Sequence, residues 1–257
     1  YMDEEKLKLF GNILYEKRKR KGLTPAECIR LMKDRNYYGA MMVEMGEADA
    51  LISGLTKDYP KTILPALQVI GVKPGVNRVA GMYIMNTSKG PFFFSDTTVN
   101  VNPTADQLVE IVGLTASGVR FFNIEPRVAM LSYSNFGSAK GEVASKTALA
   151  TAMAKAKYPE LVIEGEMQAN VAVNEDIQKE TYPFSALIGQ RANTLIFPDL
   201  SSGNIAYKLL SELGNAEAIG PVLLGMNKPV HILQLGSSIR DIINMVAIAV
   251  VDAQTKD

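Results

Sequence analysis

The sequence predicts an α/β protein in which helices cover a largely parallel β-sheet. Three observations predict this fold. Short apolar runs such as Val128–Leu131 recur along the chain, loops of small residues follow them, and segments with helical periodicity follow the loops. The 257 residues, 47% of them hydrophobic, suffice for a substantial core in one large domain or in two lobes.

The first two helices are predicted from apolar spacing and from capping residues. Residues 3–21 are expected to form a helix because Leu7, Phe10 and Leu14 fall on one face. The basic run at the end of this helix could contact nucleic acid, but a solvated helix end is the better interpretation. A second helix is expected after Thr24-Pro25-Ala26-Glu27, a capping box with proline at the first helical position.

The remaining predicted strands and helices alternate along the chain. Strands are expected at residues 48–52, 79–85, 92–94, 128–131 and 195–197, and helices at 60–70, 104–119, 139–156, 201–214 and from 238 onwards. The last of these helices places Ile239, Ile242, Ile243 and Val246 on one apolar face.

Composition excludes several classes of function. Basic and acidic residues number 27 each, so the chain has no overall field that would attract nucleic acid or an anionic membrane. With Cys28 as the one cysteine and His231 as the one histidine, a disulfide framework is excluded and a metal site is not expected. Neither a membrane-spanning apolar run nor the apolar region of a signal peptide is found, so a cytoplasmic protein is expected.

Three loops are candidate anion-binding sites because they combine small residues with hydroxyl groups. They comprise residues 53–57, 134–138 and 201–204. Ligands of α/β folds gather beyond the carboxyl ends of the strands, where glycine lets the backbone approach an anion. Taken singly, each loop is better explained by ordinary turn and capping chemistry, and neither a Walker A nor a dinucleotide-binding glycine pattern is present.

Motifs alone do not identify a catalytic group. His231 lies between apolar residues and is interpreted as structural. Asp241 comes three residues after Ser238, so a cap is at least as plausible as acid–base work. Asp96 and Asp199 could orient a ligand or cap a helix.

Several longer strings resemble the phosphate acetyl/butyryltransferase family. They are Ala192–Leu200, Gly203–Leu209, Ala218–Gly225 and Asn227–Val230, with Ala48–Gly54, Pro65–Gln68 and Ser134–Ser138 in agreement. The resemblance covers nearly the whole chain. It implies a three-layer α/β/α fold like that of isocitrate and isopropylmalate dehydrogenases, with two lobes around a cleft for CoA and acetyl phosphate. Lobe I would take residues 1–75 plus 225–257, lobe II would take residues 76–224, and the opening part of lobe I is expected to be absent.

The same resemblance implies that the catalytic residues have degenerated. The family's catalytic serine and arginine fall at Gln234 and Leu235, a second arginine falls at Glu212, and the aspartate is retained as Asp241. Acetyl phosphate is a dianion that needs positive charge, and one lost donor of this kind costs about 2.7–4 kcal/mol of transition-state stabilisation. No catalytic residue is therefore expected.

A finer resemblance, to the C-terminal domain of large NADP-dependent malic enzymes, rests on three strings: His231–Ser238, Ser134–Ser138 and Gly54–Pro60. It implies an inactive regulatory domain that binds acetyl-CoA as an allosteric effector and supports a homodimer or higher oligomer. An N-terminal malic-enzyme module, outside this sequence, would convert malate to pyruvate and would hold NADP and a divalent metal; this domain itself would need no cofactor. The alternatives are an active phosphate acetyltransferase and a purely structural dimerisation module.

The residues expected to contact acetyl-CoA come from the candidate loops. They are Ser53, Gly54, Thr56, Lys57, Ser134, Asn135, Gly137 and Ser138, with Asn204 and Asn227 as weaker members. Lys57 is the expected phosphate partner, because lysine supplies a point charge.

Overall fold

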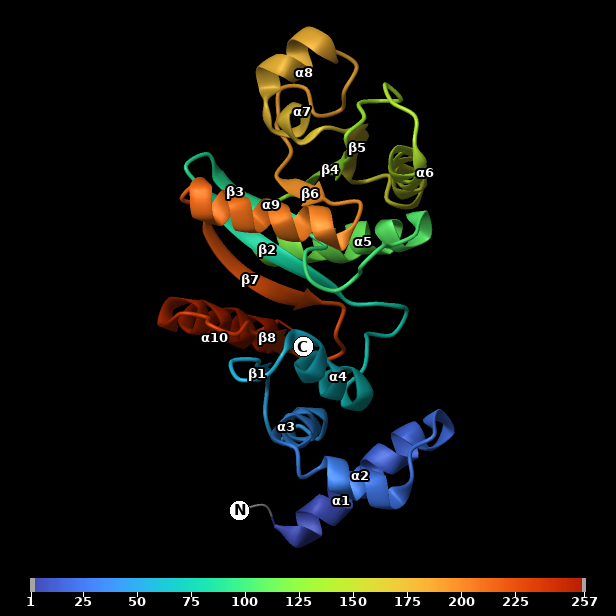
Figure 1. Ribbon diagram of the computed structural model, residues 1–257, viewed down its shortest axis with the longest axis vertical. Coiled ribbons are helices and arrows are strands. Elements are labelled where there is room, and N and C mark those ends of the chain that lie inside the picture. Colours follow the sequence, from blue (N-terminus) through green and yellow to red (C-terminus); the bar gives the residue numbers. More distant parts are fainter. Residues whose placement is uncertain (1–2, 256–257) are drawn as a thin grey trace. The chain divides into compact units, whose positions relative to one another are not determined.

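The computed structural model describes residues 3–255 and divides the chain into two compact units. Unit 1 comprises Tyr1–Asn77 and Gly225–Asp257, and unit 2 comprises Arg78–Leu224. Each unit has its own β-sheet, of two strands in unit 1 and six strands in unit 2 (Figure 1).

Unit 1 is built from helices around a small parallel sheet. Its elements are α1 (Glu4–Arg18), η1 (Lys19–Lys21), α2 (Pro25–Leu31), α3 (Arg35–Glu44), β1 (Leu51–Ser53), α4 (Tyr59–Val69), β8 (Val230–Ile232) and α10 (Ile239–Gln254). The predictions for α1 and α2 are confirmed, because Leu7, Phe10 and Leu14 are buried and Thr24 forms the capping box with Glu27. Helix α3 was not predicted.

Strands β1 and β8 bring two loops to the same edge of the sheet. They pair in parallel, with Ser53 opposite Ile232, so the segments that follow both strands leave the sheet side by side. Helix α10 buries Met245, Ile248 and Ala249, whereas Ile239 of the predicted apolar face is 78% exposed.

Unit 2 contains a mixed sheet with strand order β5-β4-β6-β3-β2-β7. Its elements are β2 (Ala80–Thr87), β3 (Gly90–Ser95), α5 (Ala105–Phe121), β4 (Arg127–Leu131), α6 (Glu142–Lys157), β5 (Val162–Met167), α7 (Ala169–Val173), α8 (Glu175–Thr181), β6 (Thr194–Ile196), α9 (Leu200–Leu213) and β7 (Glu217–Leu224). Strands β3, β6, β4 and β5 pair in parallel with one another, but β2 is antiparallel to both β3 and β7. The sheet is mixed but largely parallel, as predicted: β2 alone runs opposite to the other five strands, because a tight turn makes β2 and β3 a hairpin.

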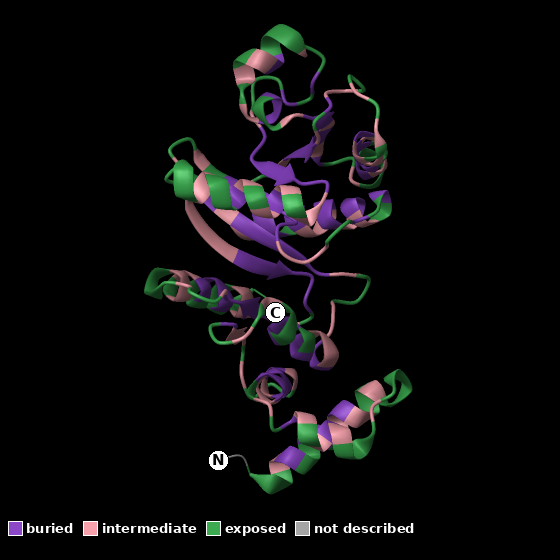
Figure 2. Ribbon diagram, in the orientation of Figure 1, coloured by how far each residue is buried: buried purple, intermediate pink, exposed green. Residues whose placement is uncertain are grey.

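The sheet of unit 2 lies between two helical layers, which gives the three-layer α/β/α architecture. Val128 and Met130 of β4 pack with α5 and α6 on one face, whereas Ala129 and Leu131 pack with α7 and α9 on the other. This alternation follows from the two-residue period of a strand, and the central strands β4 and β6 are buried on both faces (Figure 2). Each fully buried valine or methionine side chain contributes about 1.5–3 kcal/mol.

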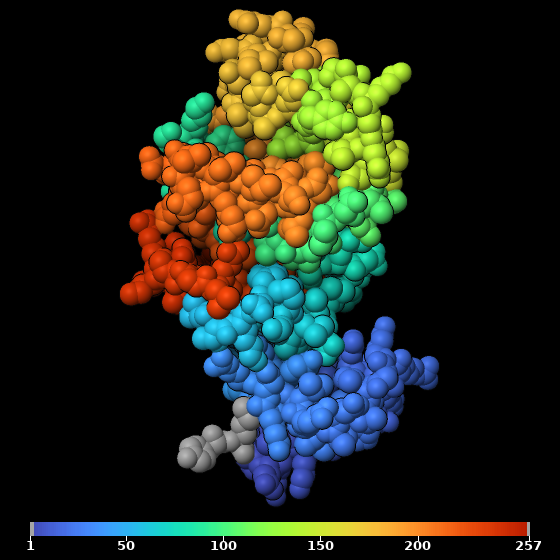
Figure 3. Space-filling model, in the orientation of Figure 1, coloured from blue at the N-terminus to red at the C-terminus, as the bar shows by residue number. Residues whose placement is uncertain are grey.

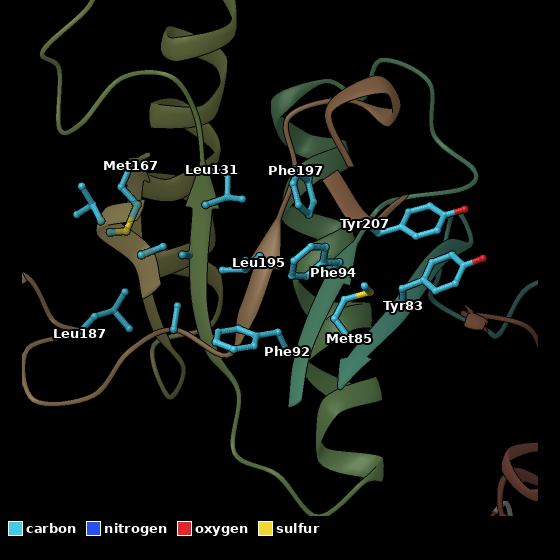
Figure 4. Packing of buried hydrophobic residues seen from close by; sticks show 14 of the residues in the cluster. Tyr83, Met85, Phe92, Phe94, Leu131, Met167, Leu187, Leu195, Phe197 and Tyr207 are labelled. Carbon is cyan, nitrogen blue, oxygen red and sulfur yellow. The ribbon is translucent and has the colours of Figure 1, made fainter. Parts of the chain in front are cut away.

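Aromatic residues fasten α9 to the sheet (Figure 4). The rings of Tyr83 on β2 and Tyr207 on α9 stack with centroids 4.1 Å apart, and Phe94 packs against Phe197 at 5.2 Å. The outer side of α9 lies on the surface of the unit (Figure 3). These ring contacts fix the position of α9, including its first turn, relative to the sheet.

Two departures from the predicted elements bear on the candidate site. The helix predicted from residue 139 begins at Glu142, because Gly141, at φ +157°, ends a longer loop after β4. Strand β5 was not predicted, because its sequence Val-Ile-Glu-Gly-Glu-Met contains two glutamates. Glu164 and Glu166 are nevertheless only 5% and 4% exposed.

Candidate functional site

The loop after β1 packs directly against the segment after β8. The Leu233 amide donates to the Ser53 carbonyl oxygen over 2.7 Å. Gly54 has φ +118°, and a Cβ atom there would lie 2.0 Å from the Leu233 carbonyl oxygen, so only glycine fits. The predicted ligand-binding loop 53–57 therefore lies beside the start of the segment that carries Gln234.

The first turn of α3 holds this loop from another side. Helix α3 begins at Arg35 because the Asp34 side chain accepts a hydrogen bond from the Asn36 amide over 2.8 Å. The Oδ1 atom of Asn36, a residue only 3% exposed, accepts a hydrogen bond from Ser53 Oγ over 2.8 Å. Arg35, which lies between Asp34 and Asn36 in the sequence, donates a hydrogen bond from its guanidinium to Thr56 Oγ1.

Arg35 contacts loop 53–57 and Lys57 belongs to it, but the charge environments of these two cations differ. The Lys57 ammonium lies 2.5 Å from Asp34 Oδ2. Burial alone raises the pKa of Asp34, but the hydrogen bonds from Lys57 and from the Asn36 amide outweigh it, so the pKa lies below its usual range. Asp34 is thus ionised at neutral pH and neutralises Lys57, whereas no described carboxylate lies within ion-pair distance of Arg35.

Arg35 was missed because nothing in its local sequence marks it as a partner of the loop. The residue lies 21 positions before Thr56, and an unpredicted helix brings it there. The available signal was the string Asp34-Arg35-Asn36 ahead of Tyr37, Ala40 and Met41, which are buried at helical spacing. The expectation that positive charge has been lost from the site is weakened by this cation.

The loop after β4, in unit 2, surrounds a carboxylate of the protein itself. Glu166 Oε1 accepts hydrogen bonds from Ser134 Oγ over 2.9 Å and from the Gly137 amide over 2.6 Å. Ser134 is fully buried, and the Phe136 amide donates to the Glu166 carbonyl oxygen. An internal anion therefore occupies donors that were predicted to bind a ligand.

The other predicted residues of this loop also serve its own structure. Asn135 Oδ1 accepts from the Gln168 amide over 2.8 Å, and Ser138 Oγ accepts from the Asn135 amide over 2.9 Å. Turn chemistry accounts for these contacts. Ligand binding by Ser134, Asn135, Gly137 and Ser138 stays a prediction.

The weaker predicted residues lie at separate places. Asn204 donates from the first turn of α9 to the Thr97 carbonyl oxygen over 3.3 Å, and the Asn227 amide donates to the Gly71 carbonyl oxygen over 3.0 Å. Asp199 caps α9 through the Ser202 amide. Loop 201–204 is therefore largely a helix start.

The acidic candidates have mostly structural contacts. Asp96 is buried and accepts hydrogen bonds from four backbone amides, those of Gly81, Thr98, Val99 and Asn100. Glu212 is exposed on α9.

The segment after β8 carries the positions that the resemblance marks as degenerate. The Gln234 amide donates to Ser237 Oγ over 3.1 Å, and Leu235 is 59% exposed. Asp241 forms a capping box with Ser238 at the start of α10. Unit 1 thus brings together loop 53–57, Arg35 and the segment that leads through Gln234 to Asp241.

His231 does not contribute to a catalytic arrangement in the described structure. It is 1% exposed, and neither ring nitrogen makes a hydrogen bond to a described residue. Its Nε2 atom lies 3.5 Å from Asp252 Oδ2. The interpretation of His231 as a buried residue rather than the base for a serine agrees with these contacts.

Residues 3–255 offer neither a metal centre nor a membrane-spanning helix. Within them, no three histidine, cysteine, aspartate or glutamate side chains are grouped as metal ligands would be. None of the helices in that range has the length and apolar character needed to cross a membrane.

The fold and the unit 1 site define an α/β protein whose sheet edge gathers hydroxyl groups and cations suited to an anion. Residues 2–250 match the phosphate acetyl/butaryl transferases, and the chain belongs to this family. It is 42% identical to a phosphate acetyltransferase of Acetivibrio thermocellus, over 98% of this chain and 78% of that protein. It is also 44% identical to an NADP-dependent malic enzyme of Haemophilus influenzae, over 93% of this chain but 32% of that protein.

Solved structures agree with the family assignment. A phosphotransacetylase from Streptococcus pyogenes superposes with a TM-score of 0.90 at 40% identity, over 99% of this chain and 76% of that one. A 4-hydroxythreonine-4-phosphate dehydrogenase from Klebsiella pneumoniae superposes with a TM-score of 0.51 at 12% identity, over 85% of this chain and 69% of that one, and shows a likeness of fold alone.

The interpretation as an inactive regulatory domain of a malic enzyme is wrong. Phosphate acetyltransferases of Acetivibrio thermocellus and Clostridium acetobutylicum match 98% of this chain along 78% and 79% of their own lengths. The malic-enzyme resemblance rested on a few short loop strings.

Proposed function

We propose that the protein is a phosphate acetyltransferase, which moves an acetyl group between acetyl phosphate and the thiol of CoA. Two observations support this proposal: the chain belongs to the phosphate acetyl/butaryl transferases, and unit 1 contains a site that suits an acyl phosphate. There, Arg35 holds Thr56 and Asp34 holds Lys57, so that loop 53–57 lies next to the segment after β8. Hydroxyl groups and cations at one sheet edge are the groups that an acyl phosphate dianion needs.

The reaction divides into an attack and a departure. The CoA thiol loses its proton to a base, and the thiolate sulfur attacks the carbonyl carbon of acetyl phosphate. A carbon–sulfur bond forms, the bond between that carbon and the bridging oxygen breaks, and phosphate leaves with the electron pair. The products are acetyl-CoA and phosphate, and the reaction requires no oxidant or reductant.

Asp241 is the proposed base, because the resemblance places the family's retained aspartate there. Its carboxylate accepts hydrogen bonds from Ser238 N and Oγ over 2.7 and 2.9 Å, which fixes its position at the start of α10. Gln234 and Leu235 stand where the resemblance expects serine and arginine, and these substitutions predict a slower reaction than a site that carries both.

Thioester formation from acetyl phosphate and CoA tests the proposal. We expect turnover by the wild-type protein, and Asp241→Asn should lower kcat by about 100-fold or more, since the amide keeps the cap but cannot accept the proton. Asp106→Asn is the matched control, because Asp106 is an exposed acid in the first turn of α5, and it should stay within about twofold.

Folded wild-type protein that forms no acetyl-CoA above the enzyme-free background would contradict the proposal. Full turnover by Asp241→Asn would remove Asp241 from the role of base while leaving the activity in place. The homodimer or higher oligomer expected from the resemblance is a separate prediction, which sedimentation of the same preparation can check.

A further inference from the structure

We propose that Arg35 binds the phosphoryl group of the acyl donor in unit 1 and supplies the positive charge that Leu235 does not. This inference rests on the proposed function and deepens it, because it names the residue that recognises phosphate. It assigns the role to a side chain that no motif of the sequence marked.

The backbone around Arg35 is fixed on both sides. Asp34 caps α3 through the Asn36 amide, and the buried Asn36 side chain is hydrogen-bonded to Ser53. Arg35 therefore leaves the helix at a constant place relative to loop 53–57, and its guanidinium reaches Thr56. A cation held in this way loses less entropy on binding a ligand than one on a mobile loop.

The charge balance of the site favours Arg35 over Lys57. Lys57 has a carboxylate partner, Asp34, at 2.5 Å, so a phosphate that binds Lys57 must compete with that carboxylate. Arg35 makes a hydrogen bond to a neutral hydroxyl and has no carboxylate partner among the described residues. An incoming dianion therefore meets one neutralised cation and one whose charge is not balanced locally.

The chemistry of the guanidinium fits a phosphoryl group. Arginine presents five N–H donors in a planar fork that matches two oxygens of a phosphate, whereas lysine supplies a point charge. The hydrogen bond to Thr56 uses one of these donors and leaves others for a ligand.

A purely structural role for Arg35 makes a different prediction. The side chain is exposed, and a single hydrogen bond to Thr56 contributes only about 0.5–1.5 kcal/mol. Loss of that bond would lower stability slightly and would leave phosphate binding unchanged. Phosphate affinity is therefore the readout that separates the two roles.

The test measures binding of inorganic phosphate by titration calorimetry and by ³¹P NMR, with steady-state kinetics on the same proteins. Arg35→Gln should weaken phosphate binding at least about tenfold and raise KM for acetyl phosphate by a similar factor, with KM for CoA within about twofold. Arg35→Lys should fall between wild type and Arg35→Gln, because it keeps the charge and loses the fork. Arg30→Gln, at an exposed arginine of α2, is the control and should match wild type.

Phosphate binding by Arg35→Gln that equals wild type would overturn the inference, as would wild-type protein that binds no phosphate. Because binding needs no turnover, the result is separable from the proposed function. A wild-type protein that is inactive, yet loses phosphate affinity when Arg35 is replaced, would contradict the transferase proposal and support the role of Arg35.

Discussion

Loops 53–57 and 134–138 have similar compositions but different partners. Each follows a parallel strand, contains a glycine with positive φ and carries hydroxyl groups. Loop 53–57 carries the cation Lys57 and is contacted by a second one, Arg35, whereas loop 134–138 closes around the buried carboxylate of Glu166. The residues of a loop make it suitable for an anion, but the neighbouring element decides whether the protein already supplies that anion.

The difference predicts that loop 53–57 serves the substrate and that loop 134–138 serves the fold. Charge supports this division, since a phosphate at loop 134–138 would have to displace or approach the carboxylate of Glu166. Substitutions that act on one loop at a time can therefore break or sharpen the contrast.

Glycine substitutions should give the largest effect. Gly54→Ala places a Cβ atom 2.0 Å from the Leu233 carbonyl oxygen at a residue with φ +118°, so the loop must move. We expect a loss of about 3–5 kcal/mol of unfolding free energy and a fall in acetyl transfer of about 100-fold or more. Urea unfolding and the thioester assay measure the two quantities.

Gly137→Ala is the matched control in the other loop. Gly137 has φ +84°, but a Cβ atom there meets no described atom within 4 Å. The cost should be about 1–2 kcal/mol, from the left-handed backbone alone, with activity within about threefold of wild type. Equal losses of activity in the two variants would end the proposed division of roles.

Glu166→Gln should have an intermediate effect on stability and a small effect on activity. Ser134 Oγ and the Gly137 amide would lose a charged acceptor in a buried site, which costs about 1–3 kcal/mol. Activity should stay within about twofold, because loop 134–138 does not bind the substrate in this interpretation. Glu160→Gln, at an exposed glutamate, controls for the loss of charge.

A fall in activity with Glu166→Gln as large as that of Gly54→Ala would place loop 134–138 in the substrate site. Stability unchanged by Glu166→Gln would show that its hydrogen bonds do not close the loop.

Local signals predicted much of the fold, because they act within a few residues. The capping box at Thr24, the cap at Ser238 and the apolar spacing of α1 identified those helices. Strand β5 was missed because its two buried glutamates are stabilised by residues far away in the sequence. Glu164 pairs with Lys155 and accepts a hydrogen bond from the backbone amide of residue 186, and Glu166 accepts hydrogen bonds from loop 134–138. The antiparallel place of β7 beside β2 depends on a long-range pairing that no local pattern encodes.

The candidate site was predicted as a set of loops but not as a charge distribution. Ser53 and Gly54 lie at the sheet edge beside Leu233, whereas Thr56 and Lys57 contact Arg35 and Asp34 at the start of α3. The ion pair of Lys57 with Asp34, the approach of Arg35 and the carboxylate inside loop 134–138 each join residues that are 21 to 32 positions apart. Composition cannot reveal such contacts, because they depend on which elements pack together.

The smallest expected effect concerns the Asp34–Lys57 pair and depends on pH. The pKa of Asp34 is lowered in the folded protein, so its contribution to stability is present above the ordinary aspartate pKa of about 3.9 and is lost as pH falls through the lowered value. Because both side chains are about one-third exposed and screened by solvent, Asp34→Asn should cost only about 0.5–1 kcal/mol at pH 7. Asparagine keeps the cap on α3, so the difference measures the lost charge.

Urea unfolding at a series of pH values should show this difference shrinking as the pH falls through the lowered pKa of Asp34, because Asp34 is then protonated in the wild type as well. Asp58→Asn, which breaks the more exposed pair with Lys61, should change stability by less than about 0.5 kcal/mol at any pH. Asp34→Asn also releases Lys57 from its counter-ion, so phosphate affinity at pH 7 should rise rather than fall. A fall in phosphate affinity would mean that loop 53–57 needs the Asp34–Lys57 ion pair to keep its shape. Lys57 would then stabilise its loop, as Glu166 stabilises loop 134–138, rather than bind the substrate.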